Sequence, residues 1–98
     1  MNNKEFEIQQ YMRLLQDQIA AISRGLISDI NCKDTETRVH NAATAIVQSL
    51  IQKNLLVSGM IETTKIDSDN IKVTIHDLQL GRKFEVAQNM VRLDKEIN

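Results

Sequence analysis

The chain has 98 residues, 12 basic and 13 acidic, and a single cysteine, Cys32. This balance argues against non-specific nucleic-acid binding, which usually needs a basic excess, and one cysteine excludes an intramolecular disulfide and a thiolate zinc cluster. The chain also lacks the ~20 consecutive apolar residues of a membrane span and the apolar stretch of a signal peptide. We therefore expect one small domain in the cytoplasm, with no membrane partner.

The first predicted element is a long helix over residues 4–27. Its apolar residues recur in steps of four and three, which is typical of a helix that packs against another helix. At ~1.5 Å per residue this helix spans about 35 Å, more than a small globule covers comfortably, so we expect part of it to pack on a second copy. We call the following residues the N-terminal seam and predict that they mediate oligomerisation: Ile8, Met12, Leu15, Ile19, Ile22 and Leu26.

A second helix is predicted after a connection at residues 28–33. Asp34 or Thr35 can cap its first turn, and Glu36 favours the positive end of the helix dipole. The helix extends to about Asn54 and carries a second apolar stripe at Val39, Ala43, Ile46 and Leu50. The two stripes together predict an αα-hairpin.

The apolar period becomes alternating after Leu55, which indicates strands. Turn-forming residues at 67–70 separate two alternating segments, so we predict an antiparallel β-hairpin. Setting Ile61 opposite Ile75 and Thr63 opposite Val73 gathers the apolar side chains on one face. This register requires a three-residue loop at 67–69, with a bulge near Asn70.

A helical period returns after Gly81 and predicts a C-terminal helix that covers the hairpin. Its stripe consists of Val86, Met90, Leu93 and Ile97. The predicted fold class is therefore α+β, with a long N-terminal αα-hairpin, an antiparallel β-hairpin and a C-terminal helix in one domain, residues 1–98.

Candidate catalytic and metal-binding residues do not form a recognisable motif. Asp67 and Asp69 lack the glycine and glutamate that a calcium loop requires at later positions. His76 and Asp77 are adjacent in a strand and point to opposite faces, which prevents an acid–base pair. His40 is a half-buried helical histidine in this interpretation. We therefore expect no catalytic residues, no metal and no cofactor, and the chain is not predicted to be an enzyme.

One local segment suggests a binding site, because it follows a strand and opens the predicted C-terminal helix. Backbone N–H groups at a helix start attract anions, basic side chains add charge, and an aromatic ring offers a stacking surface. The segment is Gly81-Arg82-Lys83-Phe84, for which we predict a phosphate-bearing ligand or an acidic patch on a protein. The alternative is a strand end with solvated cations and a phenylalanine in the core.

The leading functional hypothesis is a small, non-catalytic, homo-oligomeric binding or regulatory protein, an adaptor, inhibitor or sequestering protein. Proteins of this kind are often encoded by phages and mobile elements. The second hypothesis is a winged-helix DNA-binding regulator, which the acidic hairpin tip disfavours. Its base-reading residues would be Arg38, Asn41, Thr44, Gln48 and Gln52. The third hypothesis is that the protein sequesters a nucleotide-like anionic ligand at an oligomer interface through Arg82, Lys83 and Phe84.

Overall fold

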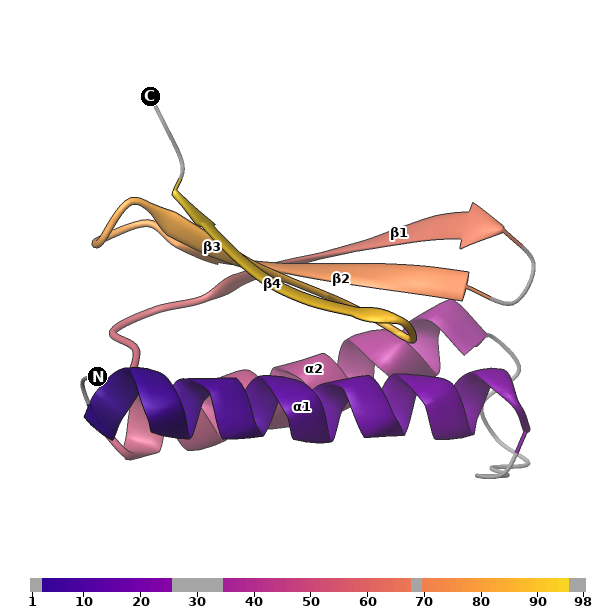
Figure 1. Cartoon of the computed structure of the whole chain (residues 1–98), viewed down its shortest axis with the longest axis horizontal. Coiled ribbons are helices and arrows are strands. Elements are labelled where there is room, and N and C mark those ends of the chain that lie inside the picture. The colour runs from indigo at the N-terminus through magenta and orange to yellow at the C-terminus, as the bar shows by residue number, and fades with distance from the viewer. Residues whose placement is uncertain (1–2, 26–34, 68–69, 96–98) are drawn as a thin grey trace.

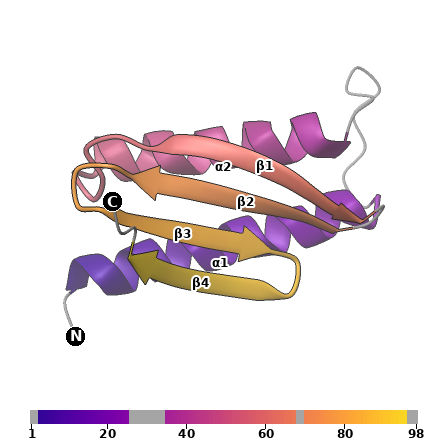
Figure 2. The same ribbon diagram turned by 90° about the horizontal axis from the view of Figure 1, so that it is seen from above.

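Two helices cover one face of a four-stranded antiparallel sheet (Figures 1 and 2). The structure is a computed structural model that describes residues 3–25, 35–67 and 70–95. Each strand is hydrogen-bonded to the next one along the chain, so the sheet order is β1-β2-β3-β4. The α+β class is therefore confirmed. The elements are α1 (Asn3–Ser23), α2 (Thr35–Gln52), β1 (Met60–Asp67), β2 (Asn70–Asp77), β3 (Arg82–Ala87) and β4 (Met90–Lys95).

Both helices end where a residue adopts the left-handed backbone conformation. Gly25 has a φ of 73°, and its N–H donates to the carbonyl of Ile22, so α1 is shorter than the predicted 4–27. Asn54 has a φ of 60°, and the N–H of Leu55 then donates to the carbonyl of Leu50 at 2.9 Å. The second of these caps turns the chain from α2 into the segment that precedes β1.

The N-terminal seam lies in the core of this one chain. Its first five residues are at most 7% exposed and belong to the same buried cluster as the stripe of α2 and the inner face of the sheet. Leu26 lies outside the described residues. An oligomer built on these five side chains would have to open this core, so their assignment to oligomerisation stays a prediction that the packing does not support.

The first two strands pair in the register that the alternation predicts, with Ile61 opposite Ile75 and Thr63 opposite Val73. The register shifts between Lys65 and Asp67, so the irregularity lies in β1 beside the pair that Asp67 forms with Asn70. Asp67, which was predicted to open the loop, therefore belongs to β1. Residues 68 and 69 of the predicted loop lie outside the described part of the chain.

Gly59, just before β1, is needed for close packing against α2. A Cβ atom there would lie 2.8 Å from Cγ1 of Val47, closer than real Cβ atoms approach other atoms. Because Gly59 has no side chain, the chain can pack closely on α2 at the point where β1 begins.

The predicted C-terminal helix is wrong, because residues 82–95 form β3 and β4. Phe84 and Val86 face the helices, whereas Lys83 and Glu85 face the other side of the sheet, which is the period of a strand. Ala87 pairs with Met90 across a two-residue turn, and Ile97 lies outside the described residues. The segment pairs with the free edge of β2 and so extends the sheet.

Within the residues that the structure describes, no helix is long and apolar enough to cross a membrane.

Adjacent leucines in α1 test the buried layer. Leu15 is fully buried and Leu14 is 46% exposed, so Leu15→Ala should lower the free energy of unfolding by about 2–5 kcal/mol. Leu14→Ala has the same chemistry without the cavity and should stay within about 0.5 kcal/mol of the parent. Urea denaturation followed by circular dichroism measures both, and equal losses would contradict the packing.

Candidate functional site

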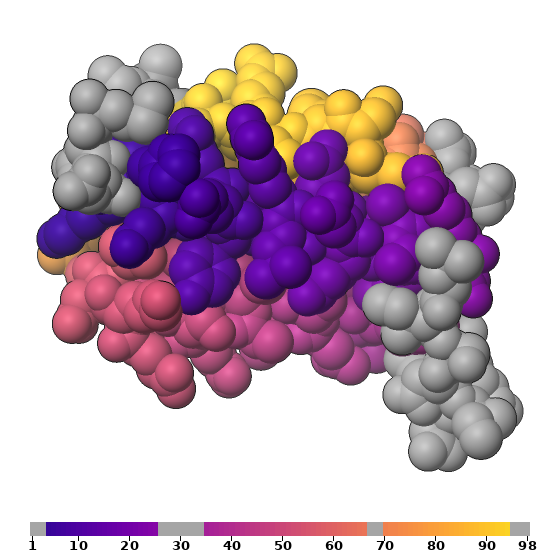
Figure 3. All heavy atoms as spheres, turned by 60° about the horizontal axis from the view of Figure 1, so that its bottom comes forward, coloured from indigo at the N-terminus to yellow at the C-terminus, as the bar shows by residue number. Residues whose placement is uncertain are grey.

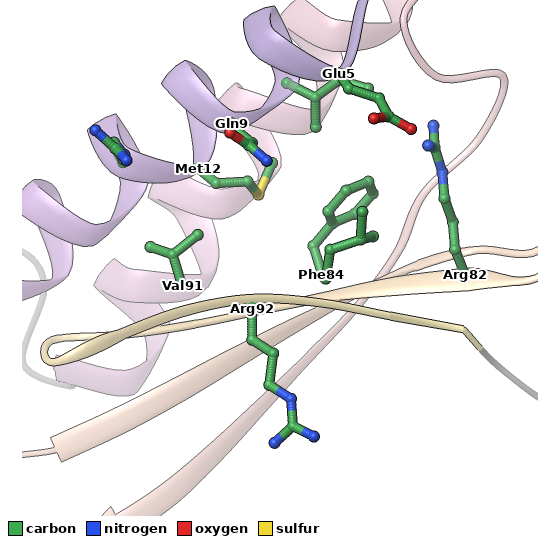
Figure 4. Close-up of a pocket in the computed structure, with 10 residues that line it drawn as sticks. Glu5, Gln9, Met12, Arg82, Phe84, Val91 and Arg92 are labelled. Carbon is green, nitrogen blue, oxygen red and sulfur yellow. The ribbon is translucent and has the colours of Figure 1, made fainter. Parts of the chain in front are cut away.

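A groove with a volume of about 180 Å³ lies between the N-terminal half of α1 and the last two strands. Its floor is apolar and consists of Ile8 and Met12 from α1 and Phe84 from β3. Val91 and Leu93 of β4 line its outer side and remain 37% and 44% exposed. We call this the α1–β4 groove. Figure 4 shows Phe84 between the helix and the sheet, with Met12 directed toward the same space.

Arg82 and Glu5 stand at one end of the groove. Figure 4 shows the Arg82 side chain extending from β3 toward Glu5 on α1. The guanidinium carbon of Arg82 lies 5.2 Å from the centre of the Phe84 ring, within the range of a cation–π contact. The cation therefore covers one part of the ring that a ligand would otherwise reach.

The charge of Arg82 is balanced by Asp77 at the end of β2. The Nε atom of Arg82 donates to Oδ2 of Asp77 at 2.9 Å, and the N–H of Leu80 donates to Oδ1 at 3.3 Å. Asp77 is 1% exposed, so both contacts supply hydrogen bonds that a buried carboxylate requires. This arrangement fixes the turn between β2 and β3.

The predicted segment Gly81-Arg82-Lys83-Phe84 does not form a helix start. Gly81 occupies the turn with a φ of 62°, and β3 begins at Arg82. Because strand residues alternate, Arg82 and Phe84 line the groove whereas Lys83 pairs with His76 and Asp94 on the opposite face. The structure thus brings together two of the four residues. Phe84 is 3% exposed and belongs to the core.

The face of the sheet away from the helices is polar and carries charges of both signs. Glu85 is the centre of this face, with Lys72 Nζ at 3.0 Å and Lys83 Nζ at 3.9 Å from its carboxylate oxygens. The hydrogen bond from Lys72 holds the pKa of the Glu85 carboxyl below its usual value, although partial burial opposes the shift. Charges on this face therefore neutralise one another.

Other candidate residues are dispersed. His76 Nε2 lies 3.3 Å from Glu62 Oε1 on the polar face, and His40 is exposed on α2. Cys32 and Asp69 lie outside the described residues. In the part of the chain that the structure describes, no group of three His, Cys, Asp or Glu residues could hold a metal ion.

Two features of the site were not predicted from the sequence. Val91 and Leu93 alternate around Arg92, a strand signal that the helical stripe obscured. The contact between Asp77 and Arg82 was missed because the five-residue separation becomes a contact only through the intervening turn.

Comparison with family models, curated proteins and solved structures yields no match to this chain.

The pH dependence of stability tests the Glu85 contact. A lowered folded pKa contributes stability that is complete above the usual value of 4.5 and is lost as the pH falls through the folded pKa. Glu85→Gln should therefore flatten the acid side of the stability curve, by less than about 1 kcal/mol because solvent screens the pair. Urea denaturation at several pH values measures this slope.

Lys72→Met provides the matched variant, since it removes the cause of the shift and leaves the carboxyl. Lys72→Met should flatten the same acid side of the stability curve. The chain with both substitutions should have nearly the same acid slope as either single variant. An acid slope that is identical in Glu85→Gln and the parent chain would contradict the assignment.

Proposed function

We propose that the chain is a small, non-catalytic, homo-oligomeric binding protein of the adaptor, inhibitor or sequestering class, and that its partner is a protein. The observation that carries the proposal is a set of exposed apolar side chains at one end of the molecule. Val57, Leu78 and Leu80 are 69%, 61% and 64% exposed, the highest values among the large apolar residues in the described ranges. We call these three residues the apolar end.

The apolar end combines two segments that are distant in sequence. Val57 lies between α2 and β1, and Leu80 lies in the turn between β2 and β3; Figure 1 shows both connections at the end where α1 begins. The two side chains line one hollow of about 250 Å³, whose apolar base includes Leu55 and Leu56. Exposed apolar side chains beside such a hollow are typical of protein-binding surfaces.

The turn that carries Leu80 is held in place by the buried carboxylate of Asp77. Since the Leu80 N–H and the Arg82 guanidinium both donate to Asp77, the turn is ordered before any partner binds. Preorganisation of this kind lowers the entropic cost of binding. Lys4 and Glu5 at the edge of the hollow carry opposite charges, which favours a protein surface over an anionic polymer.

The two alternative functions receive less support from the geometry. A base could not stack freely on Phe84, which is 3% exposed, and Arg82 is already paired with Asp77. For a winged helix, a short helix should precede the recognition helix, whereas the 21-residue α1 lies alongside α2. The hairpin that would form the wing is half of a four-stranded sheet.

Site-specific photo-cross-linking in cells that express the chain tests the partner. Leu80→benzoylphenylalanine should give a covalent adduct with one other protein, because the side chain would lie in the docking surface. Val57→Asp, added to the same chain, should reduce this adduct at least about tenfold, since it places a charge in an apolar contact.

Thr64→benzoylphenylalanine is the control, because Thr64 is exposed on β1, away from the apolar end. It should not yield the same adduct. The proposal fails if position 80 gives no adduct beyond the level seen from position 64, or if Val57→Asp leaves the adduct unchanged.

A further inference from the structure

We infer that two copies of this chain associate by antiparallel pairing of β4 with β4, about a two-fold axis at Leu93. The inference rests on the proposed homo-oligomer and names its surface. The pairing would join two four-stranded sheets into one of eight strands, with all four helices on one side.

β4 is an edge strand whose outer side carries backbone hydrogen-bonding groups. It pairs with β3 on one side, and in Figure 2 no other described segment lies beside it in the sheet. Ala87 and Met90 close a two-residue turn, so this pair exchanges hydrogen bonds and the N–H and C=O groups of Val91, Leu93 and Lys95 point outward. The chain contains no proline that would block pairing at this edge.

Charge selects one register of the self-pairing. Within one copy, Arg92 Nε already donates to the Asp94 carboxylate at 3.0 Å, so the two side chains form one ion pair on the polar face. With Leu93 on the axis, the ion pairs of the two copies meet, with Arg92 of each copy opposite Asp94 of the other, and Val91 lies opposite Lys95. With Arg92 on the axis, two arginines would face each other, and with Asp94 on the axis two aspartates would do so. Opposite charges across a pair of strands stabilise the pairing and like charges oppose it. The order Arg92-Leu93-Asp94 is thus complementary to itself in an antiparallel arrangement.

The pairing would bury the open side of the α1–β4 groove. Val91 and Leu93 face the helices but remain 37% and 44% exposed, because nothing in the described structure lies beyond β4. Figure 3 shows α1 and the yellow β4 side by side on one face of the molecule. A second copy would place Leu93 against Leu93 and close the open side of the groove over Met12 and Phe84.

The helix beneath β4 carries a matching arrangement of charge. Glu5 and Arg13 are both exposed, both line the groove, and lie four residues to either side of Gln9, which also lines it. In a two-fold dimer the two α1 helices lie antiparallel to each other, so the turn that carries Glu5 in one copy runs toward the turn that carries Arg13 in the other. Strand and helix therefore offer opposite charges to a second copy independently of each other. An unrelated extended peptide would need to reproduce both patterns.

Sedimentation equilibrium with charge-reversed variants tests this interface. The parent chain should dimerise, whereas Arg92→Asp and Asp94→Arg should each weaken self-association at least about tenfold, since each creates two like-charge pairs. An equimolar mixture of the two variants should form a one-to-one heterodimer, because every pair across the interface is then opposite in charge. The chain with both substitutions should dimerise again.

Glu62→Lys on β1 is the control, because it reverses a charge on the far edge of the sheet and should leave the dimer unchanged. Formation of the heterodimer also shows that both variants fold. Native mass spectrometry with one variant isotopically labelled identifies the heterodimer directly by its mass.

The outcomes separate the interface from the proposed function. A parent chain that stays monomeric at high micromolar concentration would overturn both this pairing and the homo-oligomer. A dimer that neither reversal weakens, or variants that do not recombine, would overturn the β4 pairing alone. Cross-linking from position 80 tests the protein partner independently of these results.

Discussion

The structure depends on one contact layer, in which the apolar stripes of α1 and α2 cover the inner face of the sheet. Leu15 and Ile19 of α1, Val39 and Leu50 of α2 and Ile75 of β2 are completely buried in this layer. A four-stranded sheet with one polar face has no other way to shield its apolar side from water. The long N-terminal helix is therefore a component of the chain's own core, and its remaining surface is polar apart from a few exposed apolar residues.

The sequence was sufficient to predict those elements in which the apolar residues follow a single period, either helical or alternating. The stripes of both helices are buried as expected, and the strand alternation was sufficient to predict the pairing of Ile61 with Ile75, because a shift by one residue would reverse every side chain. Residues 82–95 were ambiguous, since Val86, Met90 and Leu93 fit a helical stripe while Phe84-Val86 and Val91-Leu93 fit two strands. The free edge of β2 decides between them, and that edge is a property of the folded sheet.

The candidate site also depends on the folded sheet and could not be predicted from a local segment. Arg82 and Phe84 were singled out for a helix start that does not exist, yet both line the α1–β4 groove because they alternate with Lys83 along β3. Their surroundings come from α1 and β4, and no spacing within the local segment contains that information. The apolar end is likewise formed by two connections that only the completed sheet brings together. Its hollow adjoins the α1–β4 groove, because Glu5, Ile8 and Arg82 line both.

Gly59 has a consequence for recognising relatives of this chain. Its missing side chain sets how closely the helix layer and the sheet approach, since any Cβ would overlap Val47. Exchange of one aliphatic residue for another in the core can be offset by several neighbouring changes, whereas a side chain at this position keeps the layers at the same distance only if the residue at position 47 becomes smaller. A glycine immediately before the first strand, aligned with a small branched residue of the second helix, is therefore a marker that should persist after the rest of the sequence has diverged.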